Sequence, residues 1–419
     1  MPGDALAGTA AVSARPTPRT FLAIASSLCL YEAGMALNDW ADRDVDALER
    51  PHRPLPSGRI RPAAALGAAC VLTGAGLSFA AWAGRPALTV AVPLAATVWA
   101  YDLALKNTRL GPAAMATARG LDLLLGASAA SAGGAEAAQR TGDGGAGPVG
   151  GGGGVRRVVG SLGPGRLAGA FGVSADAVGD RRGVGVGQEA DAVGGLRGLG
   201  VGQKADAVGV WVSAIADEAR AASAVVPTPT AFQSIRQALP SAALLGAHTL
   251  ALTTVSRKEA QGGSPLGPLA ALATTAALAR LVTRPGPLPT DRTDEGRRHG
   301  EPPSLKHGTA TARSLPGGPL AHPPRRDSPL RLLDDPPAAL RAALATAYAV
   351  TAARPYFHAA LNPSPPLTQR AVTGGIRATI PLQAALTARS STKSATLTAL
   401  LTTALAPLAT RFARKVSVT

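Results

Sequence analysis

The chain has 419 residues, of which 46% are hydrophobic and only 3% aromatic, together with 49 glycines and 35 prolines. This length fits two or three soluble domains or one polytopic membrane domain, but a soluble core of this size would normally contain more aromatic residues. The formal net charge of +16 comes mostly from arginine. No basic face interleaved with aromatic residues accompanies it, so we expect no nucleic-acid partner. Cys29 and Cys70 lie inside apolar runs without disulfide or metal spacing, which favours buried thiols.

Apolar runs with few or no charges recur along the chain, and each approaches the roughly 20 residues that cross a bilayer. A signal peptide does not explain the first run, because no cleavage site follows it. Alanine-rich helices of a soluble bundle are the alternative, which the number of runs disfavours. We therefore predict an all-α, polytopic membrane helical bundle of about eight to nine transmembrane helices. The clear runs cover residues 21–37, 63–83, 86–100, 112–132, 238–255, 265–282, 338–353 and 395–409, with a weaker one at 376–388.

Ionisable side chains inside these runs are functional candidates, because charges within a membrane are costly. Glu32 and Asp122 are carboxylates of this kind. Arg119 lies three residues before Asp122, and on a helix this spacing predicts an ion pair between them. His248 also lies within a run. We interpret it as a packing residue in preference to a contact for an acceptor molecule.

Two long segments interrupt the apolar pattern. Residues 133–234 are rich in glycine and contain a repeat, in which GVGVGQEADAVG from Gly183 returns as GLGVGQKADAVG from Gly198. This composition predicts a mostly disordered insertion. Residues 284–337 are rich in proline and arginine without periodicity, which predicts a flexible loop. The expected organisation is therefore membrane helices at 1–132, 235–283 and 338–419, separated by these two insertions.

An acidic motif follows the first apolar run. On a helix, positions 38, 42 and 46 fall within an arc of about 80°, and position 39 joins the same side. Their mutual repulsion at a membrane–water boundary favours a bound cation, although a solvated helix end is the alternative. Carboxylate and amide oxygens suit Mg²⁺, which binds through a few carboxylates together with substrate phosphates. The four side chains are Asn38, Asp39, Asp42 and Asp46.

The acidic motif continues into a second distinctive string. The segment from Arg50 to Gly58 reads RPHRPLPSG, and together with the preceding NDWADRDVD it resembles the UbiA superfamily of intramembrane prenyltransferases. Tyr101, Asp102 and Lys106 add a match to the YDxxxK segment of that family. The resemblance implies an all-α bundle around a lipid-open cavity that binds Mg²⁺ and an isoprenyl diphosphate.

The resemblance also implies roles for individual side chains. The expected metal ligands are Asn38, Asp42 and Asp46, with Asp39 beside them. The expected contacts of the isoprenyl diphosphate are Arg53, Tyr101 and Lys106, and the expected catalytic residues are Asp42, Asp46 and Lys106. The chemistry agrees, because breaking the allylic C–O bond leaves charge on the diphosphate, which Mg²⁺, Arg and Lys stabilise.

The second half of the chain departs from the family pattern. The family has a second aspartate motif, whereas here SRKEAQGG follows the apolar run that ends at Val255. This string resembles the SRxE-type segment of a divergent bacterial branch. By that resemblance Glu259 supplies the remaining carboxylate, and Arg257 and Lys258 contact phosphate oxygens. An ordinary basic helix end is the alternative interpretation.

Counting the spans from residue 21 gives a topology. The turn after Asp46, the turn at Lys106 and the SRKE segment fall on one side of the membrane, and both insertions fall on the other. The loop at 39–62 carries five arginines, which predicts that the shared side is cytoplasmic. The family has a helix before the acidic motif's span. Residues 1–14 therefore predict a shortened first helix or a start inside it.

The preferred hypothesis is a Mg²⁺-dependent prenyltransferase in the cell membrane, spanning the lipid several times. It moves an isoprenyl group from its diphosphate to an aromatic or other small acceptor. A catalytically degenerate protein that binds a prenyl lipid is one alternative. A small-solute transporter is another, but it predicts broken helices near mid-membrane, and the polar motifs here stand at the ends of the runs.

Overall fold

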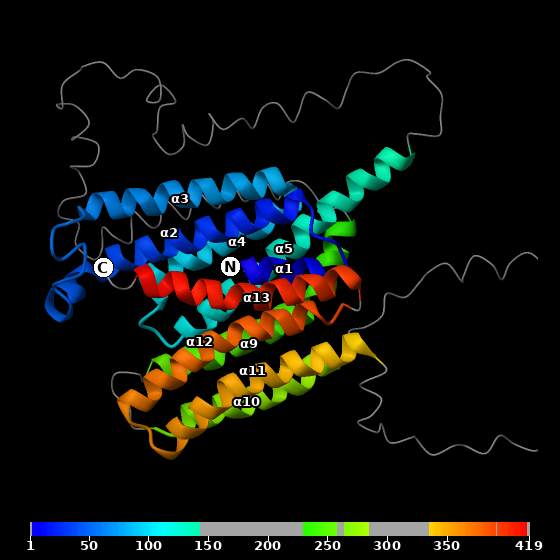
Figure 1. The fold of residues 1–419 in the computed structure, drawn as a ribbon. Helices are drawn as coiled ribbons and strands as arrows, with labels where there is room; N and C mark the ends of the chain where they lie inside the picture. Colours follow the sequence, from blue (N-terminus) through cyan, green and yellow to red (C-terminus); the bar gives the residue numbers. More distant parts are fainter. Residues whose placement is uncertain (1, 143–228, 258–263, 285–334, 391, 417–419) are drawn as a thin grey trace, which may run out of the picture.

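The protein is described by a computed structural model that covers residues 2–142, 229–257, 264–284, 335–390 and 392–416. All regular elements in these ranges are helices, so the predicted all-α fold is confirmed (Figure 1). The first five α-helices are α1 (Pro2–Ala11), α2 (Pro18–Glu49), α3 (Pro62–Ala83), α4 (Arg85–Ala100) and α5 (Gly111–Gly142). The others are α9 (Pro229–Ser256), α10 (Leu266–Thr283), α11 (Pro336–Leu361), α12 (Pro365–Thr387) and α13 (Lys393–Val416). A π-helical turn, η1 (Tyr101–Leu105), follows α4 directly.

Each apolar run predicted to cross the membrane lies within one of these helices, to within one residue at its ends. Five of the described helical segments are long and apolar enough to do so, rather than the eight to nine expected. They are Pro18–Glu49, Pro62–Ala83, Arg85–Leu105, Ala231–Ser256 and Leu266–Thr283. The fold is therefore a helical membrane bundle whose larger span count the structure does not confirm. The predicted insertions fall largely on residues 143–228 and 285–334, which lie outside the described residues, although α5 and α9 extend past the expected boundaries at 132 and 235.

The helices pack as two groups with α1 between them (Figure 1). In the first group, α2 pairs with α3, and α4 packs against α5. In the second, α11 packs against both α10 and α12. The pairing of α5 with α9 connects the groups, and α1 contacts α5 and α12. The helices run roughly parallel or antiparallel, so their ends gather at two faces.

Glycines allow α1 to approach α5 at backbone distance. A Cβ atom on Gly8 would meet the carbonyl oxygen of Leu123, and one on Gly126 would meet the backbone of Ala5. The Thr9 hydroxyl lies within hydrogen-bond distance of the Gly126 carbonyl oxygen, at 3.2 Å. Small residues of this kind let membrane helices pack closely. The short helix α1 is therefore an integral part of the core.

Polar side chains join α1 to two distant helices. The Asp4 carboxylate is fully buried and forms an ion pair with Arg119 of α5. Gln383 of α12 donates a second hydrogen bond to Asp4, over 2.6 Å. Arg119, which we expected to pair with Asp122, forms an ion pair with Asp4, and the Asp122 carboxylate also attracts its guanidinium. The sequence placed an acid three residues away on one helix, whereas the tertiary packing brings another acid from α1.

His248 has the packing role that its position indicated. It is buried, and its Nε2 lies 3.1 Å from the carbonyl oxygen of Gly375 while its Nδ1 lies 3.1 Å from the hydroxyl of Tyr348. A carbonyl oxygen can only accept, so Nε2 carries a hydrogen, and in the neutral ring Nδ1 accepts from Tyr348. Cys29 and Cys70 are free thiols, and both are partly buried instead of fully buried.

Candidate active site

The C-terminal end of α2 carries the acidic side chains on one side of the helix. Three prolines in residues 51–56 follow Glu49 and lack the N–H that would continue the helix. Asp46, in the last turn, is buried, with 7% of its side chain exposed. Asp42 and Asp39 are more open, with 32% and 46% of their side chains exposed.

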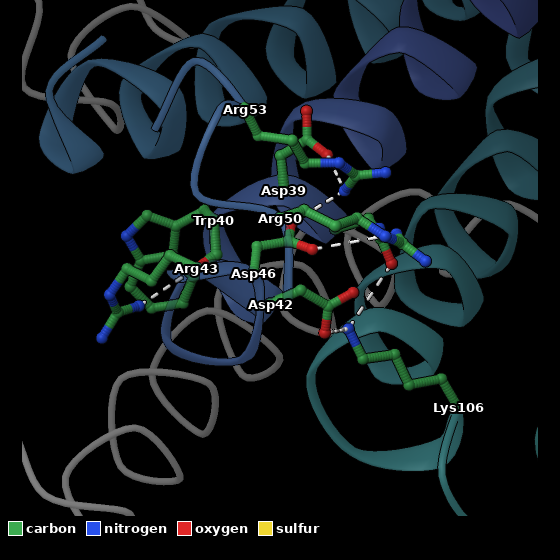
Figure 2. A network of polar contacts seen from close by, with 9 residues as sticks. Asp39, Trp40, Asp42, Arg43, Asp46, Arg50, Arg53 and Lys106 are labelled. Carbon is green, nitrogen blue, oxygen red and sulfur yellow. Dashed lines mark hydrogen bonds and ion pairs between the residues drawn. The ribbon is translucent and has the colours of Figure 1, made fainter. Parts of the chain in front are cut away.

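Lys106 reaches two of the expected ligands, Asn38 and Asp42, from a separate helix. Its ammonium contacts the carboxylate of Asp42 and lies 3.4 Å from the amide oxygen of Asn38 (Figure 2). The turn that positions it is the π-helix η1, in which the Lys106 N–H donates to the Tyr101 carbonyl at 2.9 Å. Such wide turns are rare in proteins and frequent at functional sites. The YDxxxK segment is thus joined to the acidic motif by direct contact.

Arg53 contacts the other two expected ligands, Asp39 and Asp46. Its Nη1 donates a hydrogen bond of 2.7 Å to Asp46 Oδ2 and lies 3.6 Å from Asp39 Oδ1 (Figure 2). Arg50 approaches the other oxygen of Asp46, with Nη1 3.8 Å from Oδ1. One guanidinium nitrogen thereby bridges two carboxylates whose Cα atoms lie seven positions apart in the chain.

The loop after α2 fixes the backbone of Arg53. The Arg53 N–H donates to the carbonyl of Arg50 at 3.0 Å, and the Ser57 N–H donates to the carbonyl of Arg53 at 3.0 Å. Gly58 follows with φ of 75°, a conformation that side-chain-bearing residues seldom adopt. Arg59 ties the loop to itself by donating to the carbonyl oxygen of His52 at 2.8 Å. The RPHRPLPSG string therefore builds a compact turn that presents Arg53 to α2.

The expectation that all four oxygen ligands meet at one point is not what the structure shows. Among the described residues, no three His, Cys, Asp or Glu side chains come close enough together to hold a metal ion. The ligands stand instead in two pairs, each bound to its own cation: Asn38 and Asp42 to Lys106, and Asp39 and Asp46 to Arg53. The repulsion that we expected a metal to relieve is relieved here by basic side chains.

The donor set still fits Mg²⁺ in the mode that this ion favours. Mg²⁺ is usually held by one or two carboxylates together with substrate phosphates and waters, and it rarely sits in an all-protein cage. Asn38 and Asp42, four residues apart on α2, supply one amide and one carboxylate oxygen on the same side of the helix. These residues suit a metal shared with a bound diphosphate.

Asp102 is a buried carboxylate that matched the YDxxxK segment but for which we expected no role at the site. It is 5% exposed and lies at the start of η1, next to the half-buried Tyr101. A Cβ on Gly34 would come 2.8 Å from Val98 Cγ1, so Gly34 makes room for Val98, whereas Asp102 Oδ2 would stand at an ordinary contact distance of 3.6 Å. An acid just after an apolar run was a usable signal, and the YDxxxK match already contained it.

Arg50 was missed as well, although its spacing from Asp46 gave a signal. An arginine four residues after an aspartate at a helix end is a common ion-pair arrangement. The nearby Arg43 is different, because its guanidinium lies 4.8 Å from the ring centroid of Trp40 and pairs with Asp44. Figure 2 shows Arg43 and Trp40 pointing away from Lys106.

The SRKE segment is only partly described. Arg257, at the end of α9, donates a hydrogen bond of 2.5 Å to the carbonyl oxygen of Thr108, two residues after Lys106. The end of α9 therefore lies beside the Lys106 turn, on the side that the span count predicted. The guanidinium is used to hold this turn rather than to contact the acidic pairs. Lys258 and Glu259 lie outside the described residues.

These features define a class of protein: an all-helical membrane bundle with an acidic and basic cluster where several helices end. Residues 3–139 contain this whole cluster and match the model of the UbiA prenyltransferase family. This part of the chain is therefore similar to that family. No solved structure matches the chain.

Curated relatives are similar to part of the chain. The digeranylgeranylglyceryl phosphate synthase of Methanothrix thermoacetophila is 36% identical over 111 residues, which are 26% of this chain and 42% of the relative. The chloroplastic chlorophyll synthase of Arabidopsis thaliana is 41% identical over 69 residues, 16% of this chain and 18% of the relative. The bacteriochlorophyll synthase 33 kDa chain of Rhodobacter capsulatus is 72% identical over 25 residues, 6% of this chain and 8% of the relative. Each match thus spans less than half of the relative's length.

Proposed function

We propose that this protein is an intramembrane prenyltransferase that moves an isoprenyl group from its diphosphate to a small acceptor. The observation that carries the proposal is the contact of Lys106 with Asp42, since it joins two separate sequence motifs into one cluster. The relatives are named as a digeranylgeranylglyceryl phosphate synthase and a chlorophyll synthase. Their different names support prenyl transfer in general and leave an aromatic or other small acceptor open.

The basic residues supply the part of the chemistry that a leaving diphosphate requires. Arg53 can present two N–H groups to phosphate oxygens, whereas Lys106 acts as a point charge on a flexible stem. Both stand where the apolar helices end, so a diphosphate bound here would direct its isoprenoid tail into the bundle. Stabilising charge as it develops on the leaving group is the largest contribution that such a site makes.

A divalent ion fits this assignment. When bound, Mg²⁺ would neutralise charge on the diphosphate oxygens as the allylic C–O bond breaks. Asn38 and Asp42 would hold it at one pair, with Asp46 and Asp39 available from the second pair. Tyr101, Arg257, Lys258 and Glu259 remain proposed substrate contacts, placed by the motifs that contain them.

We also propose that the site faces the cytoplasm across the cell membrane. The loop that joins α2 to α3 carries four of the five arginines counted between residues 39 and 62, and short basic loops remain on the cytoplasmic side. Substrates would then be an isoprenyl diphosphate drawn from the cytoplasmic leaflet and an acceptor small enough to enter the bundle, with surrounding lipid as the other partner.

The test compares two isosteric changes on the same helix. Membranes that contain the full chain are given a radiolabelled isoprenyl diphosphate and an extract of candidate acceptors, and prenylated products are counted. Asp42→Asn should abolish transfer, because the amide carries no charge for the metal or for Lys106. Asp44→Asn is the matched control, since 73% of the Asp44 side chain is exposed and it pairs with Arg43.

Two results would reject the assignment in different ways. Wild-type turnover in Asp42→Asn membranes would remove the site from the reaction. Tight binding of the diphosphate by the wild type, without transfer to any acceptor, would favour a protein that binds a prenyl lipid without turning it over.

A further inference from the structure

The structure pairs every expected metal ligand with a basic side chain that is also expected to bind diphosphate. Three carboxylates, Asp39, Asp42 and Asp46, face three cations, which are Arg50, Arg53 and Lys106. A carboxylate that already has a cation partner attracts a free divalent cation less strongly, and a free phosphate anion finds these cations engaged.

The competition is clearest at Asp42. The Lys106 ammonium occupies Oδ1 of this carboxylate, and the side chain of Lys106 is 15% exposed. A Mg²⁺ ion binds an oxygen at about 2.0–2.1 Å, so metal and ammonium on the same oxygen would stand close enough to repel strongly. Lys106 and a metal therefore compete for Asp42. A phosphate group is the partner that can take Lys106.

Arg53 repeats this arrangement at the second pair. Its Nη1 bonds Asp46 over 2.7 Å, while 35% of its side chain is exposed and its backbone is held within the loop. The guanidinium can therefore turn toward a phosphate without unfolding the loop. When it leaves, the oxygens of Asp46 and Asp39 become available.

We propose that the cluster is an interlock, in which Lys106 and Arg53 block the metal ligands until a diphosphate draws these cations away. Diphosphate and Mg²⁺ then bind to the cluster cooperatively, and either ligand alone binds weakly. Such coupling is reciprocal, so each ligand raises the affinity for the other by the same factor, typically about 5- to 150-fold. This inference rests on the proposed function and adds the order in which the site is loaded.

The first test measures metal binding in the absence of diphosphate. Mn²⁺ replaces Mg²⁺, and its free concentration is followed by electron paramagnetic resonance with the full chain in detergent. Lys106→Met should bind Mn²⁺ about tenfold or more tightly than the wild type, because the blocking ammonium is gone. Arg43→Met removes one positive charge from the same helix end but faces Trp40, and should leave the affinity within about twofold of the wild type.

Lys106→Arg is the control that keeps a cation at this position, and thermal unfolding shows whether Lys106→Met is folded. Lys106→Arg should retain the weak Mn²⁺ binding of the wild type, and all variants should match the wild type in thermal unfolding. Unchanged or weaker Mn²⁺ binding by a folded Lys106→Met would overturn the interlock.

The second test separates the interlock from the proposed function. An unreactive isoprenyl thiodiphosphate is bound to the same proteins with and without Mg²⁺. The wild type should bind it at least about tenfold more tightly with Mg²⁺, and Lys106→Met should bind it more weakly with a smaller dependence on the metal. Equal wild-type binding with and without Mg²⁺ would overturn the interlock alone. Failure of the wild type to bind either Mn²⁺ or the analogue would overturn the proposed function together with it.

Discussion

Arg53 and Asp46 lie seven residues apart in the chain, and a hydrogen bond of 2.7 Å joins Nη1 of the arginine to Oδ2 of the aspartate. The intervening residues end helix α2 and turn the chain back. The proline-rich string thereby places the Arg53 guanidinium beside the acidic end of the helix. Asp46 is buried by this contact, while Asp39 shares the same guanidinium nitrogen at 3.6 Å. The pairing makes the shape of the side chain at position 53 matter as much as its charge.

Arg53→Lys should therefore impair transfer although the charge is kept. A lysine ammonium cannot present the planar fork that binds two phosphate oxygens. Loss of one charge-assisted hydrogen bond, about 1.5–3 kcal/mol, corresponds to a fall of about 10- to 100-fold in kcat/KM. Steady-state kinetics on membranes measure it. Arg59→Lys serves as the control, because Arg59 bonds only atoms of its own loop in the described structure; an equal loss in both variants would mean that the loop, rather than the fork, is being tested.

Two glycine-to-alanine changes test the packing of α1. Gly126→Ala places a methyl group against the backbone of Ala5, which cannot move aside as a side chain would. We expect the free energy of unfolding in detergent to fall by about 1–3 kcal/mol. Gly67→Ala on α3 is the counterpart, since a Cβ there meets nothing within 4 Å. It should stabilise the helix by up to about 1 kcal/mol, and destabilisation by both changes would contradict the packing described.

The buried ion pair of Asp4 with Arg119 predicts a third pair of results. Arg119→Met leaves the fully buried Asp4 carboxylate without this guanidinium, and we expect a loss of about 3–5 kcal/mol. Adding Asp4→Asn removes the stranded charge and should recover part of that loss. Thermal unfolding and the yield of folded protein in membranes report both. Arg236→Met, on an exposed position of α9, should change neither measurement; a double variant worse than Arg119→Met would argue against charge as the cause.

The orientation of the bundle can be read from two single cysteines. With Cys29 and Cys70 replaced by alanine, Ser57→Cys lies in the loop beside the acidic cluster and Arg85→Cys lies at the opposite end of α3. A membrane-impermeant maleimide should label Arg85→Cys in intact cells and Ser57→Cys only after permeabilisation. The reverse pattern would place the site on the outer face.

Much of the fold could be predicted from the sequence because length and apolar composition decide membrane helices. The run at 63–83 became α3 almost residue for residue, and the break at Gly84 is a backbone position with φ of 133°. The acidic motif, Arg53 and Lys106 were also brought together as expected, because their motifs stand at the ends of adjacent spans.

The local sequence could not show which partners tertiary packing would supply. Arg119 had an acid three residues away, yet it binds Asp4 from a different helix. The acidic motif was expected to gather its oxygens around one cation, yet two basic side chains divide it into two pairs. Spacing within a helix shows which residues share a face, but it does not show which neighbouring element fills the space in front of them.

The hydrogen bond from Gln383 to Asp4 has a consequence for biosynthesis. These residues are separated by almost the whole chain, and the ribosome completes α12 long after α1 has left the exit tunnel. Asp4 can pair with Arg119 as soon as α5 has been made, but its hydrogen bond with Gln383 can form only after α12 is made. Truncations that stop before residue 365 should therefore leave α1 more accessible to protease than it is in the full chain.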